Sequence, residues 1–412
     1  MQPDGYSDGR SRGRDFFLTW SGYGVAELGF RVTALALPLM AVLRFNATPS
    51  QVGLVNGLRW VPSLAMTLWA GAWIDRGRRR PVLVWASLAY ALTLGFTSFL
   101  AARAWLRMEH LYAVSFFTGA FSMLFQLANV AHLPSLVGQE HLVEANSRMM
   151  AGYSAAEVAG PALAGAMVQY LPTTFVTGLN AVVFLFPAWG FSNIAQPEQP
   201  PPPAAGQRLA GREIAEGLRL VLDDWFLRPT SAFAFLYNVF CPMMETTVVL
   251  YATRTLGMSA GSFGAVVSVG SLGWLVGSLA AVRIEGRLGT GRAILYSMLL
   301  HTVGILAIPA VVPRGFAPFA LAAAYFALEA GAAVANVLLM SVRQAVVPAH
   351  LLGRVSSWVR LVSGCAYSLG SPVAGCLGQV VGFRPTLVIA ALGVLASCSP
   401  LWVSPVRDWR RS

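Results

Sequence analysis

The sequence contains no lysine and very little charge of either sign. All 29 of its basic residues are arginine, and charged residues make up 11% of its 412 positions, whereas an ordinary soluble domain carries roughly 25%. Hydrophobic residues make up 56%, and the mean hydropathy is +0.60. This composition excludes an ordinary soluble domain. The net charge of +11 does not indicate nucleic-acid binding, because the arginines stand between apolar runs and form no basic face.

Cysteines and catalytic motifs are also scarce. The four cysteines lie inside apolar segments without the spacing of metal ligands, so we expect small buried side chains and neither a metal site nor a cofactor. The chain has no GxxxxGKS/T loop, no HExxH and no GxSxG. These absences exclude the usual nucleotide-hydrolysing and hydrolytic sites, and we interpret the chain as a protein that is not an enzyme.

Apolar runs between arginine, proline and glycine positions predict twelve membrane-spanning helices. A bilayer core of about 30 Å requires roughly 20 apolar residues per helix. The first half contains spans at 16–43, 51–74, 82–102, 110–133, 148–170 and 174–193. The second half contains spans at 231–253, 259–282, 293–312, 316–341, 355–380 and 385–404. We therefore expect an all-α membrane protein with one six-helix bundle over 16–193 and a second over 231–404.

The segments outside the spans are polar. Residues 1–15 and 405–412 are interpreted as tails, and no signal-peptide cleavage site follows the first apolar run. Residues 194–230 are interpreted as a linker, in which Gln196–Pro203 is too rich in proline for a helix. After this proline-rich stretch, apolar residues of Gly211–Pro229 recur at helical spacing. This pattern predicts an amphipathic helix that lies on the membrane surface or on another cytoplasmic helix.

The arginine distribution predicts that both termini are cytoplasmic, because cytoplasmic loops carry the positive excess. With the N-terminus inside, most arginines fall in cytoplasmic segments, and the opposite loops hold Arg44, Arg103, Arg107, Arg254, Arg314 and Arg384. We expect a multi-pass protein of the cell membrane, in contact with lipid and monomeric.

A weak internal repeat relates the two halves. At an offset of 210, His141–Ser147 aligns with Leu351–Ser357, and Ala164, Gly165 and Gln169 align with Ala374, Gly375 and Gln379. Parallel repeats are typical of transporters in which two bundles face each other across a central cavity.

The loop after the second span carries the most specific motif. It reads Gly71-Ala-Trp-Ile-Asp75-Arg76-Gly-Arg78-Arg79-Arg80 and closely resembles the signature loop GxxxDRxGRR/K of the major facilitator superfamily, with Arg78 in place of the second glycine. With this arginine the loop resembles that of the family branch that contains macrolide efflux proteins and enterobactin exporters. The resemblance implies secondary export of a small amphiphilic molecule, such as a drug or secondary metabolite, in exchange for protons.

The resemblance also assigns a conformational latch to Gly71, Asp75, Arg76, Arg79 and Arg80. A carboxylate at the membrane edge can accept hydrogen bonds from the N–H groups at a helix start. In the family this helix is the eleventh, which here begins near 353–357. Breaking such a contact would open the cytoplasmic side. The simpler alternative is that the arginines only set the topology.

The fifth span contains Gly160, Pro161 and Gly165, which partly resemble the antiporter signature of the family. Small residues let helices approach closely, and Pro161 removes a backbone hydrogen bond. The resemblance favours export over import, although such small-residue packing also occurs in other helical bundles.

Four acids lie within the predicted spans, namely Glu27, Glu157, Glu245 and Glu329. An ionisable group inside a bilayer costs about 2.5 kcal/mol or more and usually serves a function. Glu27 and Arg31 are four residues apart on one helix face and can pair. We expect a proton switch there, with a static ion pair as the alternative.

Glu245 follows Pro242 in the seventh span, the repeat counterpart of the first, and is expected to act like Glu27. For Glu157 and Glu329, pairing with Arg59 or Arg360 is as well supported as proton transfer. The fourth span lacks the arginine that the family's proton relay carries.

Five side chains are expected to contact substrate in the central cavity: Phe30, Arg59, Tyr237, Asn238 and Asn336. Two other functions on the same fold stay open, namely import and an uncoupled sensor or lipid scramblase. The partners expected for export are a small-molecule substrate and protons.

Overall fold

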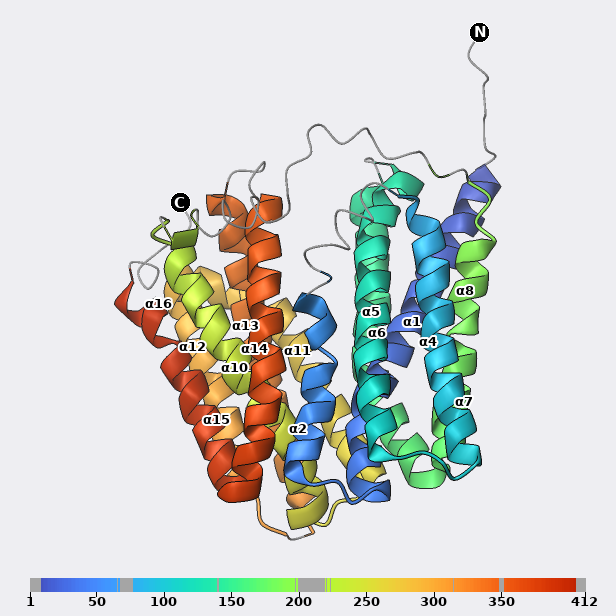
Figure 1. The fold of residues 1–412 in the computed structure, drawn as a ribbon. Coiled ribbons are helices and arrows are strands. Elements are labelled where there is room, and N and C mark those ends of the chain that lie inside the picture. The colour runs from blue at the N-terminus through green and yellow to red at the C-terminus, as the bar shows by residue number, and fades with distance from the viewer. Residues whose placement is uncertain are drawn as a thin grey trace.

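The computed structural model of the protein describes residues 9–64, 66, 77–138, 141–196, 198, 219, 221–222, 224–313, 315–347 and 352–404. Within these ranges the regular structure is helical and includes no strand. Figure 1 shows long helices that run between the same two ends of the molecule. We call the end at which α1 begins the terminal end, and the opposite end the distal end.

The first bundle contains the six predicted spans of the first half. Its helices are α1 (Gly9–Arg44), α2 (Pro49–Leu58), α4 (Arg79–Ala102), α5 (Met108–Val137), α6 (Leu142–Tyr170), α7 (Thr173–Val183) and α8 (Leu185–Ser192). The second span extends beyond α2, and its residues 67–74 lie outside the described part of the chain. The sixth span is divided at Phe184 because Pro187, inside α8, has no N–H to continue the backbone ladder.

The second bundle contains the predicted spans of the second half. Its helices are α10 (Leu227–Leu250), α11 (Ala260–Leu288), α12 (Thr290–Ala307), α13 (Ala317–Val346), α14 (Leu352–Val380), α15 (Phe383–Ser397) and α16 (Ser399–Val403). A π-helical turn, Tyr251–Thr255, extends α10, and a 3-10 turn, Ile308–Ala310, extends α12. Pro309 and Pro400 lie near the ends of the ninth and twelfth predicted spans, where the helices become irregular.

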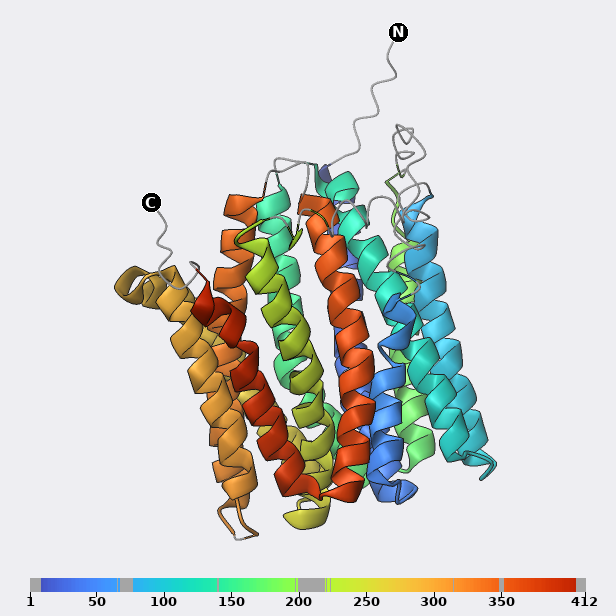
Figure 2. The ribbon, with the colours of Figure 1, turned by 60° about the vertical axis from the view of Figure 1, so that its left-hand side comes forward.

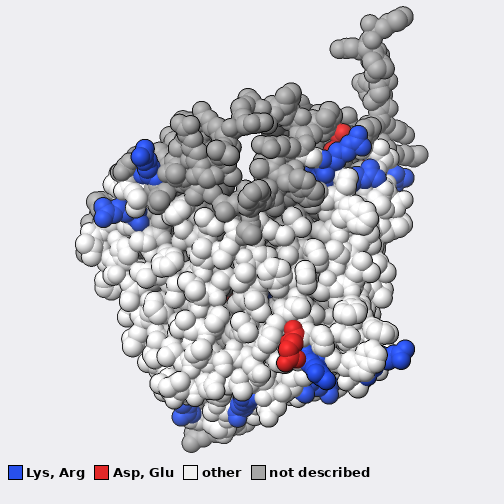
Figure 3. Space-filling view, in the orientation of Figure 1, with Lys and Arg blue, Asp and Glu red and all other residues white. Residues whose placement is uncertain are grey.

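The helices cross a membrane. Among the described residues, nine helical segments are long and apolar enough to span a bilayer. Figure 3 shows arginines near both ends of one face and a wide uncharged middle. α6 and α14 are not among the nine, since both carry many polar residues along their length.

These two polar helices join the bundles: α6 packs against α11, and α14 packs against α2. Figure 2, turned from the first view, shows α14 and α2 side by side. At the crossings glycines replace larger side chains. A Cβ atom added to Gly165 would lie 2.9 Å from the Cα of Gly264, and one added to Gly53 would lie 3.1 Å from the Cα of Gly375. The backbones therefore touch directly at both crossings.

Most of the predicted linker, including the greater part of the amphipathic segment Gly211–Pro229, lies outside the described residues. Near its end, Asp224 Oδ1 accepts hydrogen bonds of 2.8 Å from the N–H groups of Phe226 and Leu227. These bonds satisfy two free donors where α10 begins.

Candidate functional site

A cavity of about 580 Å³ opens into the second bundle, within the size range of small-molecule sites. Residues of α10, α11, α12, α13 and α14 line it, among them Tyr237, Asn238, Trp274, Asn336, Arg343 and Tyr367. Thr230, in the first turn of α10, and Gln344, near the end of α13, also line it. The cavity therefore reaches the terminal end of the bundle.

Charged side chains form a second group, whose members Glu245 and Glu329 act on Tyr367 of the cavity wall. In the first bundle the Arg31 guanidinium of α1 lies 2.8 Å from the Glu157 carboxylate of α6. It also donates a hydrogen bond of 2.6 Å to the Tyr153 hydroxyl, one turn before Glu157. Arg31 has this position because Gly160 leaves space beside it: a Cβ atom at position 160 would collide with the Arg31 Cβ.

The partner of Arg31 differs from the expected one. Sequence spacing predicted a pair of Arg31 with Glu27, on the same helix, and pairing of Glu157 with Arg59 or Arg360 was one of two equally supported alternatives. Arg31 instead bridges α1 and α6 through Glu157. Helical spacing brings Glu27 and Arg31 to one face, but it does not show which acid from a neighbouring helix lies closer to the guanidinium.

Glu27 is buried among polar groups. It is 1% exposed. The Tyr23 hydroxyl and the Gln126 amide lie close enough to its carboxylate to interact as hydrogen-bond donors, and the positive charge of Arg31 also acts on it. These groups can stabilise the charged form of the carboxylate.

Glu245 faces the first bundle from α10. It interacts with the positive charges of Arg59 and Arg31 and with the negative charge of Glu157. Its side chain is exposed although it lies in the middle of a membrane helix, which is expected of a residue on the wall of the space between the bundles. One residue further, Thr246 accepts a hydrogen bond of 3.1 Å from Asn56 of the first bundle.

Glu329 of α13 completes the set. It is repelled by Glu245 and Glu157 and attracted by Arg31. We call Glu27, Arg31, Arg59, Glu157, Glu245 and Glu329 the central charge cluster, because each member acts electrostatically on others across one region. The cluster combines four acids with two arginines, and both bundles contribute to it.

The five expected substrate contacts separate into three groups. Tyr237, Asn238 and Asn336 line the cavity. Arg59 lies at the boundary between the bundles, with its guanidinium 5.7 Å from the centre of the Trp60 ring. Phe30 is 8% exposed and packs in the core of the first bundle, against the rings of Tyr90, Phe125 and Phe184. Its assignment to the cavity wall is thus corrected, because aromatic character alone does not separate core from cavity.

At the distal end, polar contacts hold the bundles together. Arg254 of the second bundle donates hydrogen bonds of 3.2 Å to the Asn46 side chain and 2.7 Å to the Ala47 carbonyl. The N–H of Gly261 donates a hydrogen bond of 2.8 Å to Gln169, and Ser50 donates one to Gln379. Together with the glycine crossings, these contacts close the distal end.

The predicted latch is described only in part. Gly71, Asp75 and Arg76 lie outside the described residues. Arg79 and Arg80 begin α4, and their N–H groups donate hydrogen bonds of 2.5 and 3.2 Å to the Glu198 carboxylate. Glu198 therefore satisfies free donors at the start of this helix.

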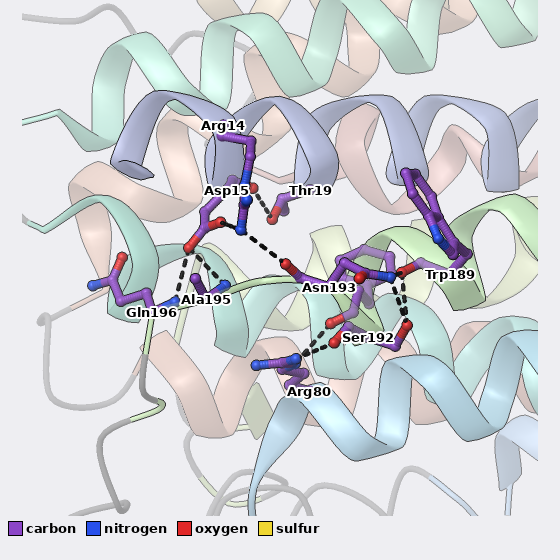
Figure 4. A network of polar contacts seen from close by, with 10 residues as sticks. Arg14, Asp15, Thr19, Arg80, Trp189, Ser192, Asn193, Ala195 and Gln196 are labelled. Carbon is purple, nitrogen blue, oxygen red and sulfur yellow. Dashed lines mark hydrogen bonds and ion pairs between the residues drawn. The ribbon is translucent and has the colours of Figure 1, made fainter. Parts of the chain in front are cut away.

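The Arg80 side chain binds the end of α8. Figure 4 shows its guanidinium pointing to the Ser192 carbonyl, and its Nε donates a hydrogen bond of 2.7 Å to the Phe191 carbonyl. In the same network Asp15 Oδ2 accepts hydrogen bonds of 3.0 and 2.8 Å from the N–H groups of Ala195 and Gln196. These contacts fasten the chain that leaves α8 to α1 and α4, all within the first bundle.

Tyr153, Tyr367 and Arg343 were not among the residues expected at the site. Tyr153 precedes Glu157 by one helical turn, a spacing that could have identified it. Tyr367 lines the cavity and packs against Trp60 of the first bundle in a tilted arrangement, with 4.5 Å between ring centroids. Arg343 lies just beyond the predicted span 316–341, but its spacing of seven from Asn336, itself seven from Glu329, places all three on one face of α13.

Comparisons with known proteins agree with this architecture. The family model described as Major Facilitator Superfamily matches residues 19–370. The uncharacterized MFS-type transporter y4rN of Sinorhizobium fredii is 25% identical over 403 residues, which cover 92% of this chain and 93% of that protein. The enterobactin exporter EntS of Escherichia coli is 25% identical over 370 residues, covering 85% and 83%.

Solved structures share the fold. The nucleoside transporter NupG matches with a TM-score of 0.73 and 13% identity, covering 97% of this chain and all of that one. A bacterial homologue of the iron transporter ferroportin, in an inward-facing state, matches with a TM-score of 0.73 and 19% identity, covering 94% and 98%.

Proposed function

Since the chain belongs to the Major Facilitator Superfamily, we propose that it exports a small amphiphilic compound, a drug or secondary metabolite, in exchange for protons. The observation that carries the proposal is the central charge cluster. It lies where the two bundles meet, next to a cavity of suitable size. Export as the direction is supported by the similarity to the enterobactin exporter EntS.

Proton coupling follows from the charge balance of the cluster. Two arginines can compensate two of the four carboxylates, and binding of two protons would make the cluster neutral. Charges in a membrane interior are costly, so a change in their number shifts the balance between conformations. Glu27 and Glu245 are the proposed proton carriers, because Glu27 is buried among polar groups that interact with its charged form and Glu245 is exposed between the bundles.

Alternating access is supported by the contrast between the two ends. The distal end is closed by glycine crossings and side-chain hydrogen bonds, whereas the cavity reaches the terminal end. With cytoplasmic termini, as the arginine distribution predicts, this state faces the cytoplasm. Rocking of one bundle against the other would break the distal contacts and expose the cavity outside.

The test uses the full chain in liposomes with an imposed pH gradient. Transport of enterobactin and erythromycin and the internal pH are measured together, for the wild type and for Glu27→Gln and Glu245→Gln. We expect transport to follow the gradient, proton movement to accompany it, and each variant to lose at least ten-fold of the gradient-driven rate. Glu109→Gln, at an exposed acid in the first turn of α5, serves as the matched control.

A transport rate that does not depend on the pH gradient and is unchanged in both variants would reject proton antiport. Flipping of fluorescent phospholipids without transport of either solute would favour the scramblase alternative. The direction of transport is determined from the substrate content of cells that produce the protein. An exporter lowers this content, while an importer raises it.

A further inference from the structure

The cavity wall carries a positive charge without a counter-charge. Arg343 lines the cavity near the terminal end of α13. Among the described residues its side chain takes part in no hydrogen bond or ion pair, and the same part of the chain places no carboxylate on the cavity lining. A cleft with one sign of charge and low-dielectric walls concentrates ligands of the opposite sign.

The face of α13 that follows the cavity is ordered along the helix. Glu329, Asn336 and Arg343 succeed one another at intervals of seven residues, which corresponds to about 10 Å per interval. Glu329 thus lies beyond the cavity lining, at the central charge cluster, whereas Asn336 and Arg343 line the cavity and Arg343 lies nearer its mouth. This order favours a ligand whose negative group points toward the mouth and whose uncharged part points inward.

The inner wall suits a flat apolar body. Trp274, Phe233 and Tyr237 line it, and the last two rings stack with 5.6 Å between their centroids. Asn238 donates a hydrogen bond of 3.0 Å to Ser363, so its amide is held in place on the wall. Aromatic walls with a few fixed polar groups are typical of sites for small amphiphiles.

We propose that the cavity binds a small aromatic organic acid, with the acid group on Arg343 and the ring system between Tyr237 and Trp274. The inference rests on the proposed function in taking the cavity as the substrate site, and it adds the charge and chemical class of the substrate. An anion on a guanidinium gains charge-assisted hydrogen bonds that a neutral analogue cannot make.

The experiment measures equilibrium binding of three probes to the purified full-length protein in detergent. The probes are 2-naphthoate, neutral 2-naphthamide and cationic 2-naphthylmethylammonium, which share one ring system. We expect the wild type to bind naphthoate at least ten-fold more tightly than the other two. Arg343→Gln should abolish this preference and keep the affinity for naphthamide within two-fold of the wild-type value. Arg343→Lys should restore part of the preference for naphthoate. Arg287→Gln, at an exposed arginine of the last turn of α11, should change nothing.

Three results would overturn the proposal: absence of naphthoate binding, equal or tighter binding of the cation, or an equal loss of affinity for all three probes in Arg343→Gln. A second arm adds phosphatidylglycerol to the detergent. Displacement of naphthoate at equimolar lipid would assign the site to a lipid headgroup and overturn the small-acid assignment.

The proposed function fails separately from this inference. Selective naphthoate binding by a protein whose transport ignores the pH gradient would reject proton antiport and keep the ligand class. Gradient-driven transport by a protein without anion preference would reject the ligand class and keep antiport.

Discussion

The side-chain oxygen of Gln169 accepts a hydrogen bond of 2.8 Å from the N–H of Gly261, and so connects α6 of the first bundle with the first turn of α11 in the second. The second bundle repeats this arrangement, because Gln379 of α14 accepts a hydrogen bond from Ser50 in the first turn of α2. The two glutamines are partners in the 210-residue repeat. The few identities of that repeat thus mark the two halves of the distal closure.

Removal of both glutamine amides should favour opening of the distal end. Each hydrogen bond contributes about 0.5–1.5 kcal/mol, so Gln169→Ala together with Gln379→Ala should raise the distally open population roughly ten-fold. Electron–electron distance measurements between spin labels at Ala104→Cys and Gly315→Cys, after replacement of Cys365 and Cys376, report this population. Asn146→Ala, whose amide bonds only within α6, is the control. An unchanged distance distribution in the double variant would contradict the assignment.

A larger residue at the α6–α11 crossing should stop transport. A Cβ atom at Gly165 would collide with the Ala260 carbonyl oxygen, so Gly165→Val should separate the helices and reduce the transport rate at least ten-fold. Gly286→Val is the matched control, because a Cβ atom there meets nothing within 4 Å. Normal transport by Gly165→Val would show that the distal end does not need this close approach.

The Arg31–Glu157 pair should appear in a double-mutant cycle. Both side chains are about one quarter exposed, so the coupling should be smaller than that of a fully buried pair, roughly 1–2 kcal/mol. Thermal unfolding in detergent of Arg31→Gln, Glu157→Gln and the double variant measures it. We expect the double variant to be more stable than the sum of the single losses predicts. Strict additivity would mean that the ion pair contributes nothing to stability.

Loss of Glu198 should destabilise the first bundle at its terminal end. Its carboxylate binds the N–H groups of Arg79 and Arg80, and loss of such a helix cap costs about 0.5–2 kcal/mol. Glu198→Ala should lower the unfolding temperature and speed proteolytic cleavage between the bundles. Glu144→Ala, at an exposed acid paired with Arg148 four residues on, should have a much smaller effect. Equal effects of the two substitutions would contradict the assignment of Glu198 as a helix cap.

Hydrophobic content, span lengths and the proline and glycine positions were enough to predict the helices. Each predicted span is helical over most of its described residues, since a chain in lipid must satisfy its backbone hydrogen bonds internally. Prolines inside apolar runs interrupted the helix only locally. Pro187 accompanies the break within the sixth span, and Pro309 lies in the 3-10 turn near the end of the ninth. The signature loop and the repeat likewise indicated the family from the residues alone.

The identity of the buried charges was also a property of the sequence, but their pairing was not. Only the packing of α1 against α6 shows that Arg31 binds Glu157 and Tyr153, with Gly160 making room for it. Only the packing of α13 against its neighbours makes Arg343, which lies beyond the predicted span, a cavity residue, and only the packing of the first bundle places Phe30 in the core. Sequence spacing determines which residues share a face of one helix, whereas the rotation of each helix against the others decides which faces meet.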